Sequence, residues 1–294
     1  MKIKISTLTD VGLVRDNNED ALISCPDLQQ QNWTTTPLSD YIPLGEFGSL
    51  LVVADGMGGP NAGEVASALT IETVKQQFSV FRVQEALKVA DEGVRQLLTD
   101  CVIAADAAIN QRMATDSETD GMGTTIVLCW ILPDGKTFFA WCGDSRGYIY
   151  NTKTGLRRIT KDHSLVQEMI DRGEITEEEA FSHPDSNIIT CGLGGFQTCP
   201  MPEIVSCMLQ PKDMVMLCSD GLCGYCTDND IQQLFSKAYT DVSDCSKKML
   251  QSALKAGGED NIAIAMASLV NDDQEKPDVA KHSWLQRLFG SRKC

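Results

Sequence analysis

Four acidic residues lie at the ends of apolar runs that are typical of β-strands: Asp55, Asp144, Asp220 and Asp260. A buried strand holds its terminal residue at a fixed and partly desolvated position. Several carboxylates that converge in this way repel one another unless cations neutralise them. Because the ligands on offer are hard oxygens, the pattern predicts magnesium or manganese rather than zinc.

Each acidic motif also has a simpler interpretation. Asp-Gly is a common hairpin turn, and the pair at 134–135 is typical of one. Residues 16–20 begin like a calcium-binding EF-hand loop, but Ala21 stands where that loop needs glycine. Residues 116–121 begin like one too, but Val127 replaces the required acid. A calcium-binding regulator is therefore disfavoured. The four acidic residues at the strand ends are evidence for a metal site only when they are taken together.

The composition disfavours nucleic-acid binding, membrane insertion and secretion. A net charge of -16 argues against nonspecific nucleic-acid binding, which needs a basic surface. No apolar stretch approaches the ~20 residues that cross a bilayer, and residues 1–8 lack the apolar core of a signal peptide. We therefore expect a soluble, cytoplasmic protein.

The twelve cysteines are scattered through apolar runs, which indicates reduced core residues. Cys223 and Cys226 have zinc-ligand spacing, but no second pair of that kind follows.

Hydrophobic periodicity predicts the elements that position the acidic residues. Strand-like runs cover residues 2–8, 50–54, 124–132, 137–142, 146–150, 214–218 and 262–269. Helical periodicity covers residues 63–81, 83–113, 164–172, 228–237 and 243–256. Turn signals separate neighbouring strands, and two helices follow one another with no strand between them. This order favours an α+β fold of antiparallel sheets covered by helices.

Three further segments are predicted to be peripheral. Residues 25–48 are rich in polar residues and should form a surface loop rather than core. Residues 271–280 are typical of a polar linker, and residues 281–294 form a short basic amphipathic tail. We expect this tail to dock on the acidic body or to be disordered, and membrane contact through it is disfavoured.

Eight motifs occur in a fixed order along the chain: Gly12 to Asp20, Val53 to Gly59, Gly63 to Ser67, Met122 to Thr125, Gly143 to Arg146, Lys161 to Ser164, Cys218 to Leu222 and Gly258 to Asn261. In these motifs the chain resembles the metal-dependent protein phosphatases of type 2C, the PPM family. Met57 makes it similar to the bacterial branch. The resemblance implies a four-layer αββα sandwich, with two antiparallel sheets flanked by helices. It also implies a catalytic domain at 1–270, followed by the linker and tail at 271–294.

The resemblance further implies a set of metal ligands. Asp55 would bridge two Mn²⁺ or Mg²⁺ ions, and the carbonyl of Gly56 would bind one of them. Asp220 and Asp260 would complete the coordination of the first ion, and Glu19 would hold the second, partly through water. The ions would lower the pKa of a bridging water that attacks phosphorus.

Catalytic roles are implied for Arg15, Asp20 and Asp55. Arg15 would clamp the phosphate with its planar fork of donors, and Asp20 would orient metal-bound water. The general acid stays open, because Met57 stands where eukaryotic members commonly carry histidine. Metal-bound water or His183 would then protonate the leaving group. Asp144 is a candidate ligand for a third, weak ion.

The third-ion site and the substrates complete the expectations. Gly224 stands where relatives usually place an aspartate, so the third site should be empty or weak. Residues 165–195 resemble the family's flap beside the active site, although an inert surface excursion remains the alternative. The implied substrates are proteins that a serine/threonine kinase has phosphorylated. The alternative function is a catalytically inactive scaffold that binds phosphoproteins.

Overall fold

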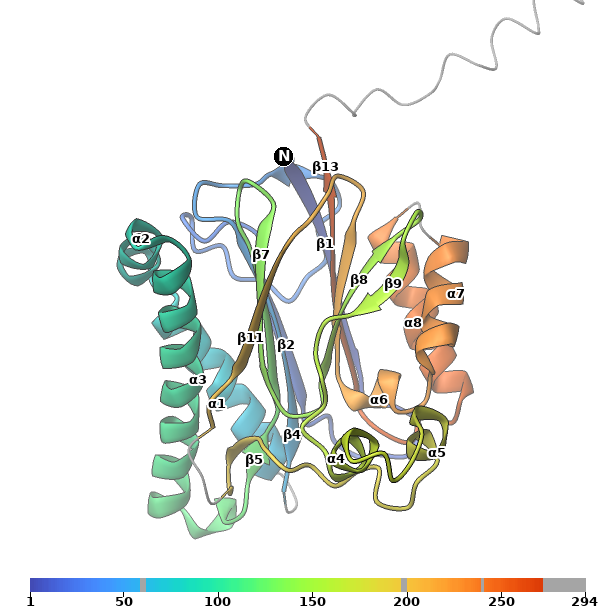
Figure 1. Cartoon of the computed structure of the whole chain (residues 1–294). Coiled ribbons are helices and arrows are strands. Elements are labelled where there is room, and N and C mark those ends of the chain that lie inside the picture. The colour runs from blue at the N-terminus through green and yellow to red at the C-terminus, as the bar shows by residue number, and fades with distance from the viewer. Residues whose placement is uncertain (59–61, 197–199, 239–240, 272–294) are drawn as a thin grey trace, which may run out of the picture.

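The computed structural model describes residues 1–58, 62–196, 200–238 and 241–271. Within these ranges the strands form two antiparallel sheets that pack face to face (Figure 1). One sheet has the order β3 (Ile42–Pro43), β1 (Lys2–Asp10), β13 (Ile262–Val270), β12 (Met214–Cys218), β8 (Arg146–Asn151) and β9 (Gly155–Arg158). The other has the order β10 (Leu193–Gly194), β5 (Gly123–Thr124), β4 (Ser49–Met57), β6 (Ile126–Ile131), β7 (Lys136–Cys142) and β11 (Glu203–Met208), with β2 (Asp20–Cys25) paired to β4.

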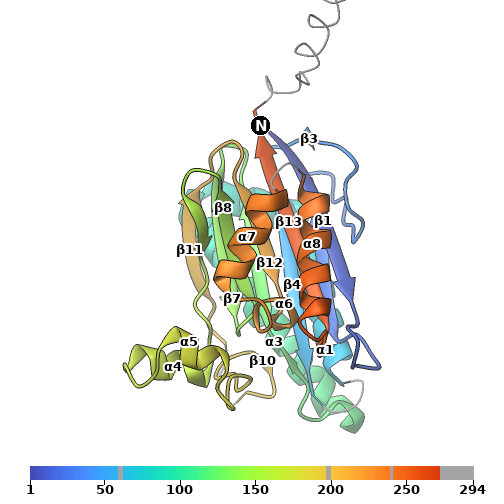
Figure 2. The same cartoon turned by 90° about the vertical axis from the view of Figure 1, so that its right-hand side faces the viewer.

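Helices cover the outer face of each sheet. The β4 sheet is covered by α1 (Ala62–Gln77), α2 (Val80–Lys88) and α3 (Ala90–Thr115), and the other by α6 (Asp220–Cys223), α7 (Asp228–Ala238) and α8 (Val242–Lys255). Two short helices, α4 (Leu165–Asp171) and α5 (Glu177–Phe181), lie beyond one end of the sheets (Figure 2). A 3₁₀ turn, Ser117–Thr119, follows α3. The α+β sandwich expected from the sequence is confirmed. None of the helices in the described ranges is long and apolar enough to span a membrane.

Strand β4 shows why the apolar runs are continuous. Leu50, Val52 and Ala54 pack against the helices, whereas Leu51 and Val53 pack between the two sheets. Successive side chains of a strand point to opposite faces, so a strand that is buried on both faces needs apolar residues at every position.

Some predicted bounds were wrong. The predicted helix 83–113 is interrupted at Ala90, which has a φ of 53°, so that α2 ends and α3 starts in a new direction. The segment 25–48 was predicted as surface loop, yet Leu28 is fully buried in the helix-side core. The strands β2, β3, β9, β10 and β11 were missed. The residues of β11 are exposed or half-buried, so it lacks the apolar run that signals a strand. From residue 272 on, the predicted linker and tail lie outside the described residues.

Candidate metal centre

The predicted carboxylates gather at one end of the sandwich, where β4 ends and α6 begins (Figure 1). Asp55 is near the end of β4 and lies opposite Asp20, the first residue of β2, in the antiparallel register. Asp144 lies in the turn between β7 and β8, Asp220 opens α6, and Asp260 precedes β13. Five segments that are distant in sequence therefore deliver their carboxylates to the same end of the molecule.

The strand alternation directs two of these side chains. Asp55 follows Val53 on the face of β4 that packs between the sheets, and Asp20 shares its face of β2 with Leu22, which also packs there. The hydrophobic layer between the sheets therefore ends in a pair of facing carboxylates.

Two neutral residues next to the predicted ligands hold the site together. Ser219 donates through Oγ to Asp20 Oδ2 at 2.6 Å and accepts from the backbone N–H of Ala263 at 2.8 Å. Asn261 accepts from the Glu19 N–H at 2.8 Å and donates to the carbonyls of Val11 and Asn17, each at 2.9 Å. The sequence contained both residues inside the acidic motifs but did not reveal these positioning roles.

Close backbone packing fixes the position of Gly56 and Glu19. The Gly56 N–H donates to the Glu19 carbonyl at 3.2 Å. A Cβ on Gly56 would lie 2.2 Å from the Gly63 carbonyl oxygen, and a Cβ on Gly63 would lie 2.7 Å from Glu19 Oε2. Only glycine therefore allows the start of α1 to pack this closely against the ends of β2 and β4.

Burial and mutual repulsion make the carboxylates resist ionisation. Burial, together with the charges of Asp220 and Asp260, raises the pKa of Asp20 to about 8. Burial and the charges of Asp220 and Asp20 raise the pKa of Asp55 well above its ordinary value. The pKa of Asp220 is raised for the same two reasons, burial and then the charge of Asp260. A group of carboxylates in this state attracts cations.

Asp144 is the sixth predicted ligand. Burial and the charge of Asp220 raise its pKa to about 8, and its Oδ1 atom is buried without a hydrogen-bond partner among the described residues. Buried polar atoms normally have partners, so an orphan carboxylate oxygen suits a cation ligand. These oxygen donors fit a hard divalent cation.

Arg15 lies at the rim, with its side chain 51% exposed. Its Nη2 donates to Asp260 Oδ2 at 2.9 Å, so the predicted phosphate clamp is linked to a predicted metal ligand.

His183 is placed differently from the other candidates. Its Nδ1 accepts from the Asp185 N–H, and no hydrogen bond in the described part of the chain connects its ring to the carboxylates.

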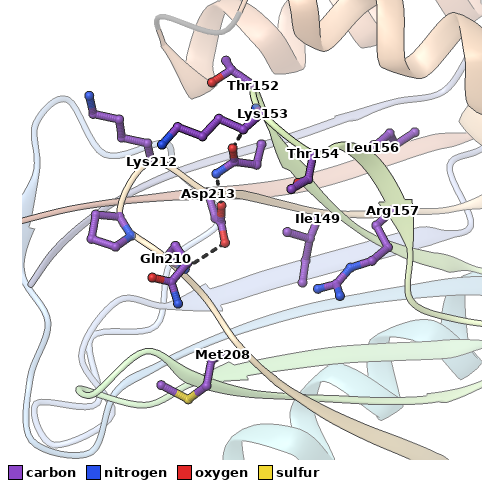
Figure 3. Close-up of a pocket in the computed structure, with 12 residues that line it drawn as sticks. Ile149, Thr152, Lys153, Thr154, Leu156, Arg157, Met208, Gln210, Lys212 and Asp213 are labelled. Carbon is purple, nitrogen blue, oxygen red and sulfur yellow. Dashed lines mark hydrogen bonds between the residues drawn. The ribbon is translucent and has the colours of Figure 1, made fainter.

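A cavity of about 760 Å³ lies at the opposite end of the sandwich, where β12 begins. Its lining includes Lys153, Arg157 and Lys212 and none of the predicted carboxylate ligands (Figure 3). Two of its lining residues are joined by a hydrogen bond, which the Asn151 side chain donates to Asp213. This cavity is separate from the candidate metal centre.

Known proteins are similar to this chain in sequence and in fold. The family model for Protein phosphatase 2C matches residues 36–266. The serine/threonine protein phosphatase PstP of Mycobacterium tuberculosis is 31% identical over 95% of this chain, and this chain spans 48% of its length. The protein phosphatase PhpP of Streptococcus pneumoniae is 31% identical over 93% of this chain and 100% of its own length.

Solved structures agree with these relatives. The crystal structure of the M. tuberculosis PstP superposes with a TM-score of 0.73 at 30% identity, over 92% of this chain and 100% of that one. A second structure, the PstP catalytic domain in complex with two manganese ions, gives a TM-score of 0.69 at 29% identity, over 92% of this chain and 99% of that one. The segment 36–266, which the family model matches, contains seven of the eight ordered motifs and most of the sandwich. The chain therefore belongs to the protein phosphatase 2C family, the PPM phosphatases of the bacterial type.

Proposed function

We infer that this protein is a metal-dependent protein serine/threonine phosphatase. The observation that carries the proposal is the group of carboxylates from four segments, Asp20, Asp55, Asp144 and Asp220, in which burial and mutual repulsion raise the pKa values. Such a group is stable in its ionised form only beside cations. Relatives named as serine/threonine phosphatases at 31% identity give the reaction class.

We assign two Mn²⁺ or Mg²⁺ ions to this centre. The bridging ligand would be Asp55, with Gly56, Asp220 and Asp260 on one ion and Glu19 on the other. The two manganese ions bound by a PstP catalytic domain support this assignment. When bound, such ions supply positive charge at the phosphoryl group and a water nucleophile near neutral pH. Asp144 would serve a third, weaker ion, in keeping with its unpaired Oδ1.

The chain's own residues would bind and orient the substrate. Arg15 is exposed at the rim and offers planar donors to phosphate oxygens. Asp20, held by Ser219, would accept a hydrogen bond from the attacking water and fix its direction. The substrates would be phosphoserine and phosphothreonine proteins, and the site of action the cytoplasm.

Hydrolysis of an aryl phosphate by the purified chain, with and without manganese, tests the proposal. The alternative is an inactive scaffold that binds phosphoproteins. We expect turnover with manganese and none in excess chelator, restored when manganese is returned. An inert wild-type protein at saturating manganese would instead support the scaffold.

A further inference from the structure

A second group of metal-ligating side chains lies close to the carboxylate centre. Cys142 ends β7, His163 follows β9 in the chain, and Cys191 precedes β10. One ligand atom from each of these residues lies within 4.8 Å of the other two, and the two sulfur atoms are 3.0 Å apart. They form the one such group of three among residues 1–58, 62–196, 200–238 and 241–271.

The surrounding structure holds His163 in place before any ion binds. The His163 ring is stacked on Trp141, and its Nδ1 accepts from the Gly143 N–H at 3.2 Å. In the neutral ring Nε2 then carries the proton and can donate it to Glu203 Oε1, 3.3 Å away. Backbone bonds join His163 N–H to the Gly143 carbonyl at 3.0 Å and the Thr190 N–H to the His163 carbonyl at 2.8 Å. A metal-binding histidine usually donates its other ring N–H to a carboxylate, so Glu203 would orient the ring and Nδ1 would be the ligand nitrogen in place of its contact with the Gly143 N–H.

The donor set and the spacing suit a soft, tetrahedral cation. Ligand atoms bound to zinc at about 2.0–2.3 Å lie roughly 3.3–3.8 Å from one another in a tetrahedron. The 4.8 Å limit and the sulfur separation are within about 1 Å of these values, so small rotations of the side chains would be enough. Glu203 is not among the residues whose ligand atoms meet this limit, so water would take the fourth position. Two thiols and an imidazole favour zinc, whereas the neighbouring carboxylates favour manganese or magnesium.

The burial of the two thiols gives an ion a route to the group. Cys142 is buried and Cys191 partly exposed, so an ion could reach the site from the side of Cys191.

We propose that Cys142, His163 and Cys191, with the His163 ring oriented by Glu203, form a zinc site distinct from the carboxylate centre. An ion here would join the end of β7, two residues before Asp144, to both ends of the segment 165–190 that carries α4 and α5. The site would therefore fix the base of that segment beside the carboxylates.

Cobalt(II) titration of the reduced, metal-free full chain tests this proposal, with excess magnesium present to occupy the carboxylates. Thiolate ligands give cobalt a sulfur-to-metal charge-transfer absorption that oxygen ligands cannot give. We expect this band to saturate at one equivalent and to disappear when zinc is added. Cys191→Ser should lose the band. Cys207→Ser, at a partly exposed cysteine outside the group, is the matched control and should keep it.

Two results would overturn the zinc site. The first is a reduced wild-type protein that gives no charge-transfer band, which needs no variant to fold. A disulfide between Cys142 and Cys191 in the protein as purified, combined with that missing band, would assign the pair to redox chemistry instead. The second is a band that Cys191→Ser and Cys142→Ser both leave unchanged.

Discussion

At the scale of single residues, neutral side chains hold the acidic ones in position. Ser219 bonds both Asp20 and the start of β13, and Asn261 connects Glu19 to the loop that carries Arg15. A carboxylate pinned in this way cannot turn away from its neighbours to relieve repulsion. The site is therefore preorganised for cations.

Arg15 provides the first test at this scale. Arg15→Lys keeps the charge but loses the planar fork, so the KM for an aryl phosphate and the inhibition constant of inorganic phosphate should each rise about tenfold. Arg112→Lys, on the exposed surface of α3, is the control. Unchanged values of both constants would exclude the clamp role.

Asp144 provides a second test. If it holds a weak third ion, Asp144→Ala should remove the part of the activity that appears only above saturation of the two-ion centre in a manganese titration. Asp134→Ala, in the β6–β7 turn, should not. The reverse variant Gly224→Asp is a poor test, because a Cβ at Gly224 would lie 2.8 Å from the Asp220 carbonyl oxygen. A titration curve that Asp144→Ala does not change would contradict a third ion at this residue.

At the scale of elements, the start of α1 must pack against the ends of β2 and β4. Glycine-to-alanine changes inside helices usually stabilise by ~1 kcal/mol. Gly63→Ala should do the opposite, because its Cβ would displace Glu19 Oε2, and both thermal stability and activity should fall. Ala68→Gly, on the exposed face of the same helix, should lower stability slightly and leave activity intact. A Gly63→Ala protein that is stabilised and fully active would show that this packing is not required.

The elements that the sequence predicted well are those whose burial leaves a clear hydrophobic pattern. The run 50–54 is apolar at every position because both faces of β4 are buried, and α8 shows the helical period because one face is buried. The break at Ala90 was not predictable from the pattern, since it depends on a backbone angle and on α2 crossing α3 at Gly93. The acidic ligand candidates were found because they lie inside motifs that occur in a fixed order along the chain. The grouping of Cys142, His163 and Cys191 was not found, although His163 lies inside one of those motifs, because only tertiary packing brings the three together.

At the scale of the whole molecule, the buried carboxylates should make stability depend on pH. The pKa values of Asp20 and Asp144 rise from an ordinary 3.8 to about 8 in the folded chain. Between these values the folded state binds more protons than the unfolded state, so its stability falls as pH rises from about 4 to about 8.

Thermal unfolding in excess chelator measures this dependence. The Tm of the metal-free chain should be lower near pH 8 than near pH 6, and saturating manganese should reduce the difference because it neutralises the carboxylates. Asp20→Asn should also show a weaker dependence. A metal-free Tm that rises across this range would contradict the account of the site.

The central claim is that the carboxylate centre performs phosphoester hydrolysis. The most direct measurement is the turnover of a phosphothreonine peptide by Asp220→Asn at saturating manganese, compared with wild type and with Asp40→Asn, which changes an exposed loop residue. Asparagine keeps the volume and removes the charge, so the account predicts a loss of at least ~100-fold for Asp220→Asn, with an unchanged circular-dichroism spectrum. Asp40→Asn should match wild type. Wild-type turnover by a folded Asp220→Asn protein would contradict the assignment of the site.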